Sequence, residues 1–219
     1  AYTQYAKNPN LKWEETTTIN AGIDFGFLNN RITGTVDVYQ RDTKDLLLYT
    51  QNPPFFGFSN FDNYNVGKIR NRGLEISGTV IPVKNDNFEW TVGGNITFQN
   101  SEITALSSDA PEFSGIATGG YEGGTGNFIQ NHQIGYAPSS FYVYEQAYDA
   151  AGKPMDGVFV DRNGDGLVNE KDKYRFHKPA ADVFYGFNTN LTYKNWDFAA
   201  AFRGSWGNYM YNNVDSNNG

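Results

Sequence analysis

Apolar and polar residues alternate along several segments of the chain, most clearly in residues 88–99. There the even positions include Phe88, Trp90 and Phe98, whereas the odd positions are polar or glycine. Successive side chains of a strand point to opposite faces of its sheet, so this period predicts strands with one apolar and one polar face. The predicted strands lie near 16–27, 31–43, 69–81, 88–99, 183–193 and 196–206.

Two kinds of connection separate these strands. Short turns are predicted at Asn29 and Asn30, at 82–87, and at Lys194 and Asn195, because asparagine tolerates the positive φ of tight hairpins. Long loops are predicted over 44–68 and 100–182. Short turns at one end and long loops at the other are typical of outer-membrane barrels.

The strand lengths favour a membrane barrel over a soluble β-sandwich, which alternates in the same way. Several predicted strands reach 10 or more residues, which suits a membrane-crossing strand better than the average soluble one. Aromatic residues also cluster where strands meet short turns, as in an interfacial girdle. The predicted fold class is all-β: an antiparallel transmembrane β-barrel segment. Six strands cannot close a useful barrel, so we expect residues 1–219 to be part of a larger one.

Composition removes several classes of function. The chain has 17 Lys and Arg against 24 Asp and Glu, a formal charge of −7. This balance disfavours a nucleic-acid partner, which requires clustered basic residues. The absence of cysteine excludes disulfides and thiolate chemistry. No pair of carboxylates, histidines or other groups forms a recognisable catalytic set, so an enzyme is not expected.

The stretch DRNGDGLVNEKD, residues 161–172, fits the spacing of a calcium-binding loop. Oxygen ligands recur at every second position and a glycine, Gly166, stands at the sharp turn. Calcium accepts 6–8 such hard ligands, so we expect a structural Ca²⁺ in an extracellular loop. The alternative is a turn that binds no metal and caps itself with side-chain hydrogen bonds. The predicted ligands are Asp161, Asn163, Asp165, the Leu167 carbonyl, Asn169 and Asp172.

Several stretches together resemble the late barrel region of SusC/RagA-like TonB-dependent outer-membrane transporters of Bacteroidota. They follow the family's order and cover nearly the whole chain. They are NPNLKWEETTTINAGIDFGFLNNRITGTVDVYQRDTKDLL (8–47), VGKIRNRGLEISGTV (66–80), HQIGYAPSSFYVYEQAYDAAGKP (132–154), VFVDRNGDGLVNEKDK (158–173) and YGFNTNLTYKNWDFAAAFRGSWGN (185–208).

This resemblance implies a plugged barrel of about 22 strands in the outer membrane of a Gram-negative bacterium, surrounded by its lipid. It also implies energy from the TonB system through a plug outside this chain, and a SusD-like surface lipoprotein as lid. The expected cargo is an oligosaccharide, or a peptide. The alternative function is a soluble, secreted, calcium-stabilised β-rich binding or adhesion module.

The loop aromatics are candidates for stacking on sugar or packing against a lid protein, but self-packing explains them equally well. They cluster between Phe55 and Tyr64 and again at Tyr142, Tyr144 and Tyr148. No substrate-binding residue is assigned from them. His132 and His177 are expected on loop surfaces rather than at a metal.

Overall fold

A computed structural model describes residues 10–51, 61–106, 115–121 and 127–214. The chain forms two compact units. The first, here called the sheet unit, contains residues 1–113 and 181–207. The second, the loop unit, contains residues 114–180 and 208–219. Among the described residues, no helix is both long enough and apolar enough to cross a membrane.

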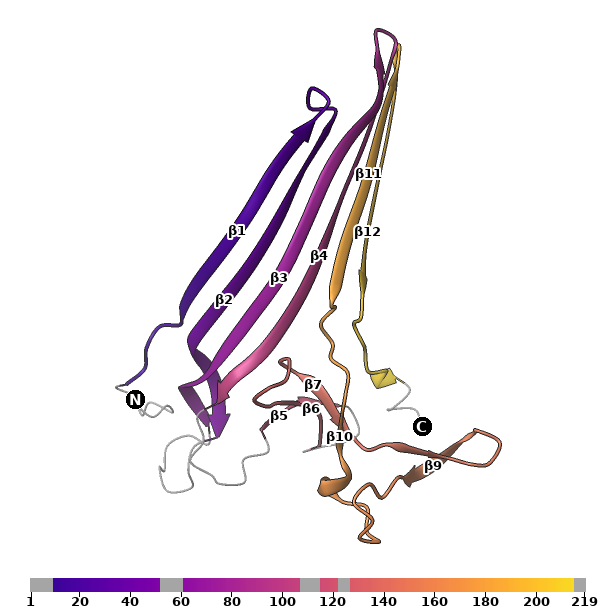
Figure 1. The fold of residues 1–219 in the computed structure, drawn as a ribbon. Helices are drawn as coiled ribbons and strands as arrows, with labels where there is room; N and C mark the ends of the chain where they lie inside the picture. The colour runs from indigo at the N-terminus through magenta and orange to yellow at the C-terminus, as the bar shows by residue number, and fades with distance from the viewer. Residues whose placement is uncertain (1–9, 52–60, 107–114, 122–126, 215–219) are drawn as a thin grey trace, which may run out of the picture. The chain divides into compact units, whose positions relative to one another are not determined.

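The sheet unit is one antiparallel sheet of six long strands in the order β1-β2-β3-β4-β11-β12 (Figure 1). Each strand pairs with its neighbour in sequence except at one place, where β4 pairs with β11. In the sequence, residues 114–180 of the loop unit lie between these two strands. The strands are β1 (Glu15–Phe27), β2 (Ile32–Gln51), β3 (Phe61–Asn85), β4 (Phe88–Leu106), β11 (Val183–Tyr193) and β12 (Trp196–Trp206).

The strand register sorts the predicted alternation into two continuous faces. Residues directly opposite each other across the strands share a face. One apolar row across the sheet is Ile23, Val36, Ile76, Ile96, Tyr185 and Gly204. The adjacent row, on the opposite face, is Asp24, Thr35, Ser77, Asn95, Gly186 and Arg203.

The apolar face is exposed rather than packed in a core. Ile23 is 71% exposed, Phe202 63% and Trp206 75%. On β4 the band runs from Phe88 to Phe98, ten residue steps or about 33 Å along the strand. At a tilt of about 40° this corresponds to a height of about 25 Å, which matches the apolar band of outer-membrane barrels.

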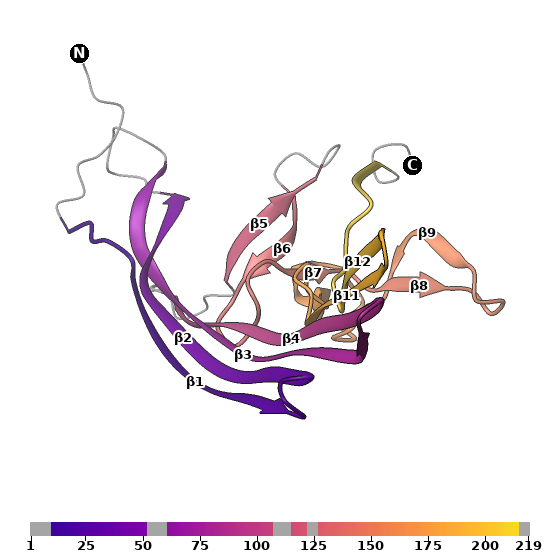
Figure 2. The same cartoon turned by 90° about the horizontal axis from the view of Figure 1, so that it is seen from above.

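Glycines on both faces make room for aromatic rings from the neighbouring strand. The ring of Phe25 lies over its opposite residue Gly34, where an added Cβ would be 2.5 Å from Phe25 Cζ. Tyr39 covers Gly73 on the polar face in the same manner. Removing the side chain of one partner lets the other lie flat against the sheet, whose curvature in β1–β4 is visible in Figure 2.

The short turns are tight, as the sequence predicted. β1 and β2 are joined by residues 28–31, in which Leu28, Asn29 and Asn30 all have positive φ. Lys194 and Asn195 join β11 to β12, and Lys194 also has positive φ. The turn expected over 82–87 is shorter than predicted, because β3 continues through a register shift between Val80 and Val83 and ends at Asn85.

The predicted loop over 44–68 is largely strand. β2 continues to Gln51 and β3 already begins at Phe61, with register shifts between Thr43 and Leu47. The alternation is hidden there because residues 41–45 are polar or charged on both faces. A period of two is visible in the sequence only where one face is apolar.

The predicted loop over 100–182 is also more ordered than expected. β4 continues to Leu106, and the loop unit contains a four-stranded sheet in the order β10-β7-β6-β5 and a hairpin of β8 and β9. Strands this short carry too few residues to show a period. They are β5 (Ile116–Gly120), β6 (Phe128–His132), β7 (Ser140–Val143), β8 (Gln146–Tyr148), β9 (Pro154–Phe159) and β10 (Tyr174–Phe176), with a 3₁₀ turn η1 (Glu170–Asp172) between β9 and β10.

The packing of the Phe25 ring over Gly34 on the apolar face can be tested by substitution. Replacing Gly34 by alanine places a methyl group 2.5 Å from the Phe25 ring and 2.7 Å from the Ser77 backbone oxygen, which cannot move away. We expect a loss of about 1–3 kcal/mol in stability, measured by thermal unfolding of the full-length protein in detergent. Gly78→Ala is the matched control, because its methyl group meets only the Thr33 oxygen at 3.5 Å. Equal stability of the two variants would contradict the proposed packing.

Candidate functional site

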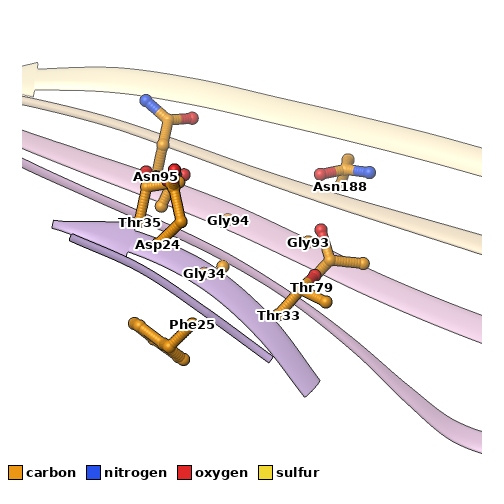
Figure 3. Close-up of a pocket in the computed structure, with 12 residues that line it drawn as sticks. Asp24, Phe25, Thr33, Gly34, Thr35, Thr79, Gly93, Gly94, Asn95 and Asn188 are labelled. Carbon is orange, nitrogen blue, oxygen red and sulfur yellow. Dashed lines mark hydrogen bonds between the residues drawn. The ribbon is translucent and has the colours of Figure 1, made fainter. Parts of the chain in front are cut away.

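The polar face of the sheet contains a hollow of about 490 Å³ (Figure 3). Its wall consists mainly of small hydroxyl and amide side chains with glycines between them. Thr35 and Ser77 share a hydrogen bond of 2.8 Å between their hydroxyl oxygens. The polar lining residues are Asp24, Thr33, Thr35, Ser77, Thr79, Asn95 and Asn188.

Two amides of this wall lie flat over glycines of the adjacent strand. A Cβ added at Gly93 would be 2.5 Å from Asn188 Oδ1, and one added at Gly186 would be 2.5 Å from Asn95 Oδ1. The result is a smooth, hydrated surface with hydrogen-bonding groups close to the backbone. Such a surface suits the polar interior of a barrel. It offers one carboxylate and no nucleophile–base pair, so it does not suggest catalysis.

The loop unit is organised around the guanidinium group of Arg175. Arg175, in β10, donates hydrogen bonds across β7 to the side chains of Asn131 in β6 and of Gln133 directly after it. Its charged group also lies 4.5 Å from the ring centre of Tyr136 and 5.0 Å from that of Tyr142. Burial lowers the pKa of Arg175, but the guanidinium stays charged at any physiological pH. Tyr142, a candidate for ligand stacking, therefore packs within its own unit.

The predicted calcium loop follows β9 and ends at η1. Both oxygens of the Asp161 carboxylate accept backbone hydrogen bonds, from Gly164 and Gly166 at 2.7 Å each. Asn163 Oδ1 accepts from the Asp165 backbone at 2.8 Å, and Asp165 Oδ1 accepts from Leu167 at 2.9 Å. The loop thus consists of successive Asx turns, with positive φ at both glycines.

Asp172 holds this loop together from its C-terminal end. Its side chain is fully buried, and Oδ1 accepts from the Arg162 and Asn163 backbone while Oδ2 accepts from Asn169 at 2.8 Å. The hydrogen bond from Asn169, followed by those from Asn163 and Arg162, lowers the pKa of Asp172. Because the pKa is lowered, the ionised carboxylate stabilises the fold at pH values above 3.8, the pKa of the unfolded chain. This contribution is lost as the pH falls through the lower pKa of the folded protein.

The donor set of this loop is compatible with calcium, but its side chains already have protein partners. Carboxylate and amide oxygens each retain a second lone pair, so an N–H contact does not exclude a metal contact. Among the residues that the structure describes, however, no three His, Cys, Asp or Glu side chains gather closely enough to hold a metal. Coordination would therefore also depend on Asn163, Asn169 and the Leu167 carbonyl, which now accepts from Asn169 Nδ2 at 3.2 Å.

The two histidines differ in burial: His132 is half-buried within the loop unit, whereas His177 is exposed on its surface, as expected. His132 lies in β6, and its Nδ1 accepts a hydrogen bond from the Ser139 backbone at 3.1 Å. Burial lowers the pKa of His132, which keeps this nitrogen available as an acceptor near neutral pH. His177 stacks on Tyr209 with ring centres 3.8 Å apart and planes at 3°. Neither histidine faces a set of metal ligands within the described part of the chain.

A second hollow, of about 290 Å³, lies in the loop unit and is lined mainly by aromatic side chains. Phe176 is 40% exposed, Tyr209 41% and Met210 90%. Of the lining residues, the sequence pointed only to Tyr144. The lining comes from three segments, 141–144, 176 and 209–211, which meet only in the fold. The earlier candidates Phe55, Phe56 and Phe58 lie outside the described residues. The lining is Phe141, Val143, Tyr144, Phe176, Tyr209, Met210 and Tyr211.

Together these features define the class of protein as an outer-membrane β-barrel, whose antiparallel sheet is apolar toward lipid and polar toward the interior. A model of the family described as "TonB dependent receptor-like, beta-barrel" matches residues 1–218. The chain belongs to this family, whose members are located in the outer membrane. Its relatives are receptors and transporters, which agrees with the prediction that the chain is not an enzyme.

Individual relatives agree with the family match. The chain is 45% identical over 213 residues to the TonB-dependent receptor SusC of Bacteroides thetaiotaomicron, covering 97% of this chain and 21% of that protein. It is 29% identical to the TonB-dependent receptor P26 of Formosa agariphila, over 94% of this chain and 21% of that protein. The resemblance to SusC/RagA-like proteins inferred from the sequence is confirmed.

Among solved structures, the RagAB peptide transporter matches with a TM-score of 0.76 and 28% identity, over 95% of this chain and 23% of the matched chain. The same importer in an open state matches with a TM-score of 0.73, covering 94% of this chain and 22% of that one. The chain thus spans about a fifth of the length of its relatives.

The role of Asp172 can be tested at neutral pH in the full-length protein. Asp172→Asn replaces one of two acceptor oxygens with a donor, so at least one backbone N–H group in the loop loses its partner. We expect cleavage within 160–175 by a broad-specificity protease to become several-fold faster. Glu170→Gln is the control, since its carboxylate is 75% exposed. If both variants resist protease as well as the parent does, Asp172 does not hold the loop.

Proposed function

We propose that the full-length protein to which these residues belong imports oligosaccharides across the outer membrane, driven by TonB and covered by a SusD-like lipoprotein. The observation that carries the proposal is the 45% identity to SusC over 97% of the chain. The two faces of the sheet support it, because the apolar face suits lipid and the polar face suits a hydrated passage. The soluble adhesion module is not favoured, since its exposed apolar face would have no cover in water.

The aromatic hollow of the loop unit supports an oligosaccharide as cargo. The apolar C–H faces of sugar rings stack on aromatic side chains, and Phe176, Tyr209 and Tyr211 are each more than a third exposed. Hydrogen-bonding groups lie beside it, where the Tyr144 hydroxyl donates to Glu170 Oε1 at 3.4 Å. Peptide is the second candidate, because the RagAB complex is a peptide transporter and an apolar side chain would also fit such a hollow.

Uptake by cells distinguishes these cargoes. Cells that lack the gene and are complemented with the full-length protein are given labelled oligosaccharides or labelled peptides, and accumulation is measured with and without TonB. We expect TonB-dependent accumulation of the oligosaccharide. Tyr209→Ala should weaken uptake about fivefold to tenfold through loss of a stacking ring. Tyr193→Ala is the matched control, because Tyr193 is similarly exposed but lies at the short-turn end of the sheet. Accumulation of peptide alone would replace oligosaccharide as the cargo.

We also propose that residues 161–172 bind Ca²⁺ as a structural ion. The spacing of Asp161, Asn163 and Asp165 supports this proposal, as do the positive φ angles of Gly164 and Gly166, which turn the backbone sharply between the ligands. Asp165 is exposed and Asp161 is half-buried, whereas Asp172 is fully buried and accepts hydrogen bonds from the backbone. The ion would bridge side chains that otherwise only cap their own turns.

Chelation tests this second proposal in the full-length protein. Adding EGTA should increase protease cleavage within 150–180, and Asp165→Ala should produce the same pattern while abolishing any response to EGTA. Asp156→Asn, an exposed acidic position on β9 outside the loop, is the control. If EGTA and Asp165→Ala change nothing while Asp172→Asn opens the loop, the loop is a self-capped turn without metal.

A further inference from the structure

The apolar face of the sheet ends abruptly toward the long connections. In the row next to Ala21 and Val38, the same face carries Ile19, Gln40 and Arg72. One row further it carries Thr17, Asp42 and Arg70. The face therefore changes from apolar to charged within about 7 Å along the strand. Because the long connections of such barrels are extracellular, this change marks the outer boundary of the membrane.

The polar groups at this boundary form a connected chain across β2 and β3. Arg72 Nε donates to Gln40 Oε1 at 2.8 Å, and Gln40 Nε2 donates to Asp42 Oδ2 at 2.6 Å. Arg70 Nε donates to the other oxygen of Asp42 at 2.6 Å. The chain fixes both guanidinium groups on the lipid-facing side of the sheet, directly beyond the apolar band.

Beside this chain lies a cavity of about 310 Å³ with an excess of positive charge. Three cationic side chains and one carboxylate line it. Lys44 is paired with Glu15 at 2.7 Å and Arg70 with Asp42, but Lys68 has no ion pair among the described residues. The lining includes Thr17, Asp42, Lys44, Lys68, Arg70 and Thr104.

We propose that this cavity binds the phosphate of an outer-leaflet lipid headgroup. Lysine and arginine bind phosphate through charge-assisted hydrogen bonds, and threonine hydroxyls supply further donors. The lipid is favoured over a free anion because the cavity lies on the lipid-facing side, only two rows beyond the apolar row of Ala21 and Val38. A lipid whose phosphate occupied it would lay its acyl chains along the apolar band. The inference rests on the membrane-facing geometry of the sheet and is independent of the cargo.

Copurification and native mass spectrometry of the full-length protein test this site. The protein in detergent is titrated with purified lipid A, a phosphate-bearing lipid of outer membranes, and separately with inorganic phosphate. We expect Lys68→Gln to weaken lipid A binding about fivefold and to lower the amount of copurified phosphorylated lipid, as loss of one interfacial cation predicts. Lys68→Arg should retain both, since it keeps the charge.

Arg41→Gln is the matched control, because Arg41 is an exposed cation next to Asp42 in the sequence but on the opposite face of the same strand. It should leave lipid binding unchanged, and unchanged thermal unfolding of all variants verifies folding. Equal losses from Arg41→Gln and Lys68→Gln would overturn the proposal, as would inorganic phosphate binding as tightly as lipid A. Loss of sugar uptake in the cargo test would leave this result unaffected.

Discussion

The hydrogen-bond ladder between strands is the constraint on which the rest of this molecule depends. No water is available in the hydrocarbon layer to satisfy backbone N–H and C=O groups, so each strand must pair along its whole length. β1 pairs with β2 from Glu15 to Phe27 without interruption, and β11 pairs throughout with both β4 and β12. Register shifts occur mainly outside the centre of the apolar band. The ladder keeps the sheet intact although almost no apolar residue of the described chain is buried.

Once the ladder is in place, the two faces are determined by their surroundings. The apolar face needs only to be compatible with lipid, so exposed Ile23, Phe202 and Trp206 are favourable there rather than costly. The polar face needs to hold water, and amides lying over Gly93 and Gly186 keep it smooth. The same alternation also locates the membrane boundary, since charged Arg70 and Arg72 replace apolar residues on the outward face.

The loop unit follows a different principle. It has no lipid to set a pattern, and it is held by a few groups that join distant segments. Arg175 connects Asn131 and Gln133 with the rings of Tyr136 and Tyr142, while Asp172 closes the loop that begins at Asp161. Short strands and side-chain hydrogen bonds thus replace the long ladders of the sheet unit. This arrangement places exposed aromatic rings around one hollow.

The sequence alone was sufficient for the six strands, their tight turns and the family, because alternation is local and lipid enforces it residue by residue. The Asx turns of residues 161–167, which the sequence offered only as the alternative to a calcium loop, are also local, since their hydrogen bonds span five residues or fewer. The full length of β2 and β3 was not predictable, since Asp42 and Lys44 interrupt the apolar period beyond the membrane. The full burial of Asp172 became visible only in the folded loop. The packing of Arg175 against Asn131 and the position of Tyr144 and Tyr209 around one hollow were decided only by the tertiary structure. These last arrangements bring together residues far apart in the chain, and no local pattern records which distant partner each residue finds.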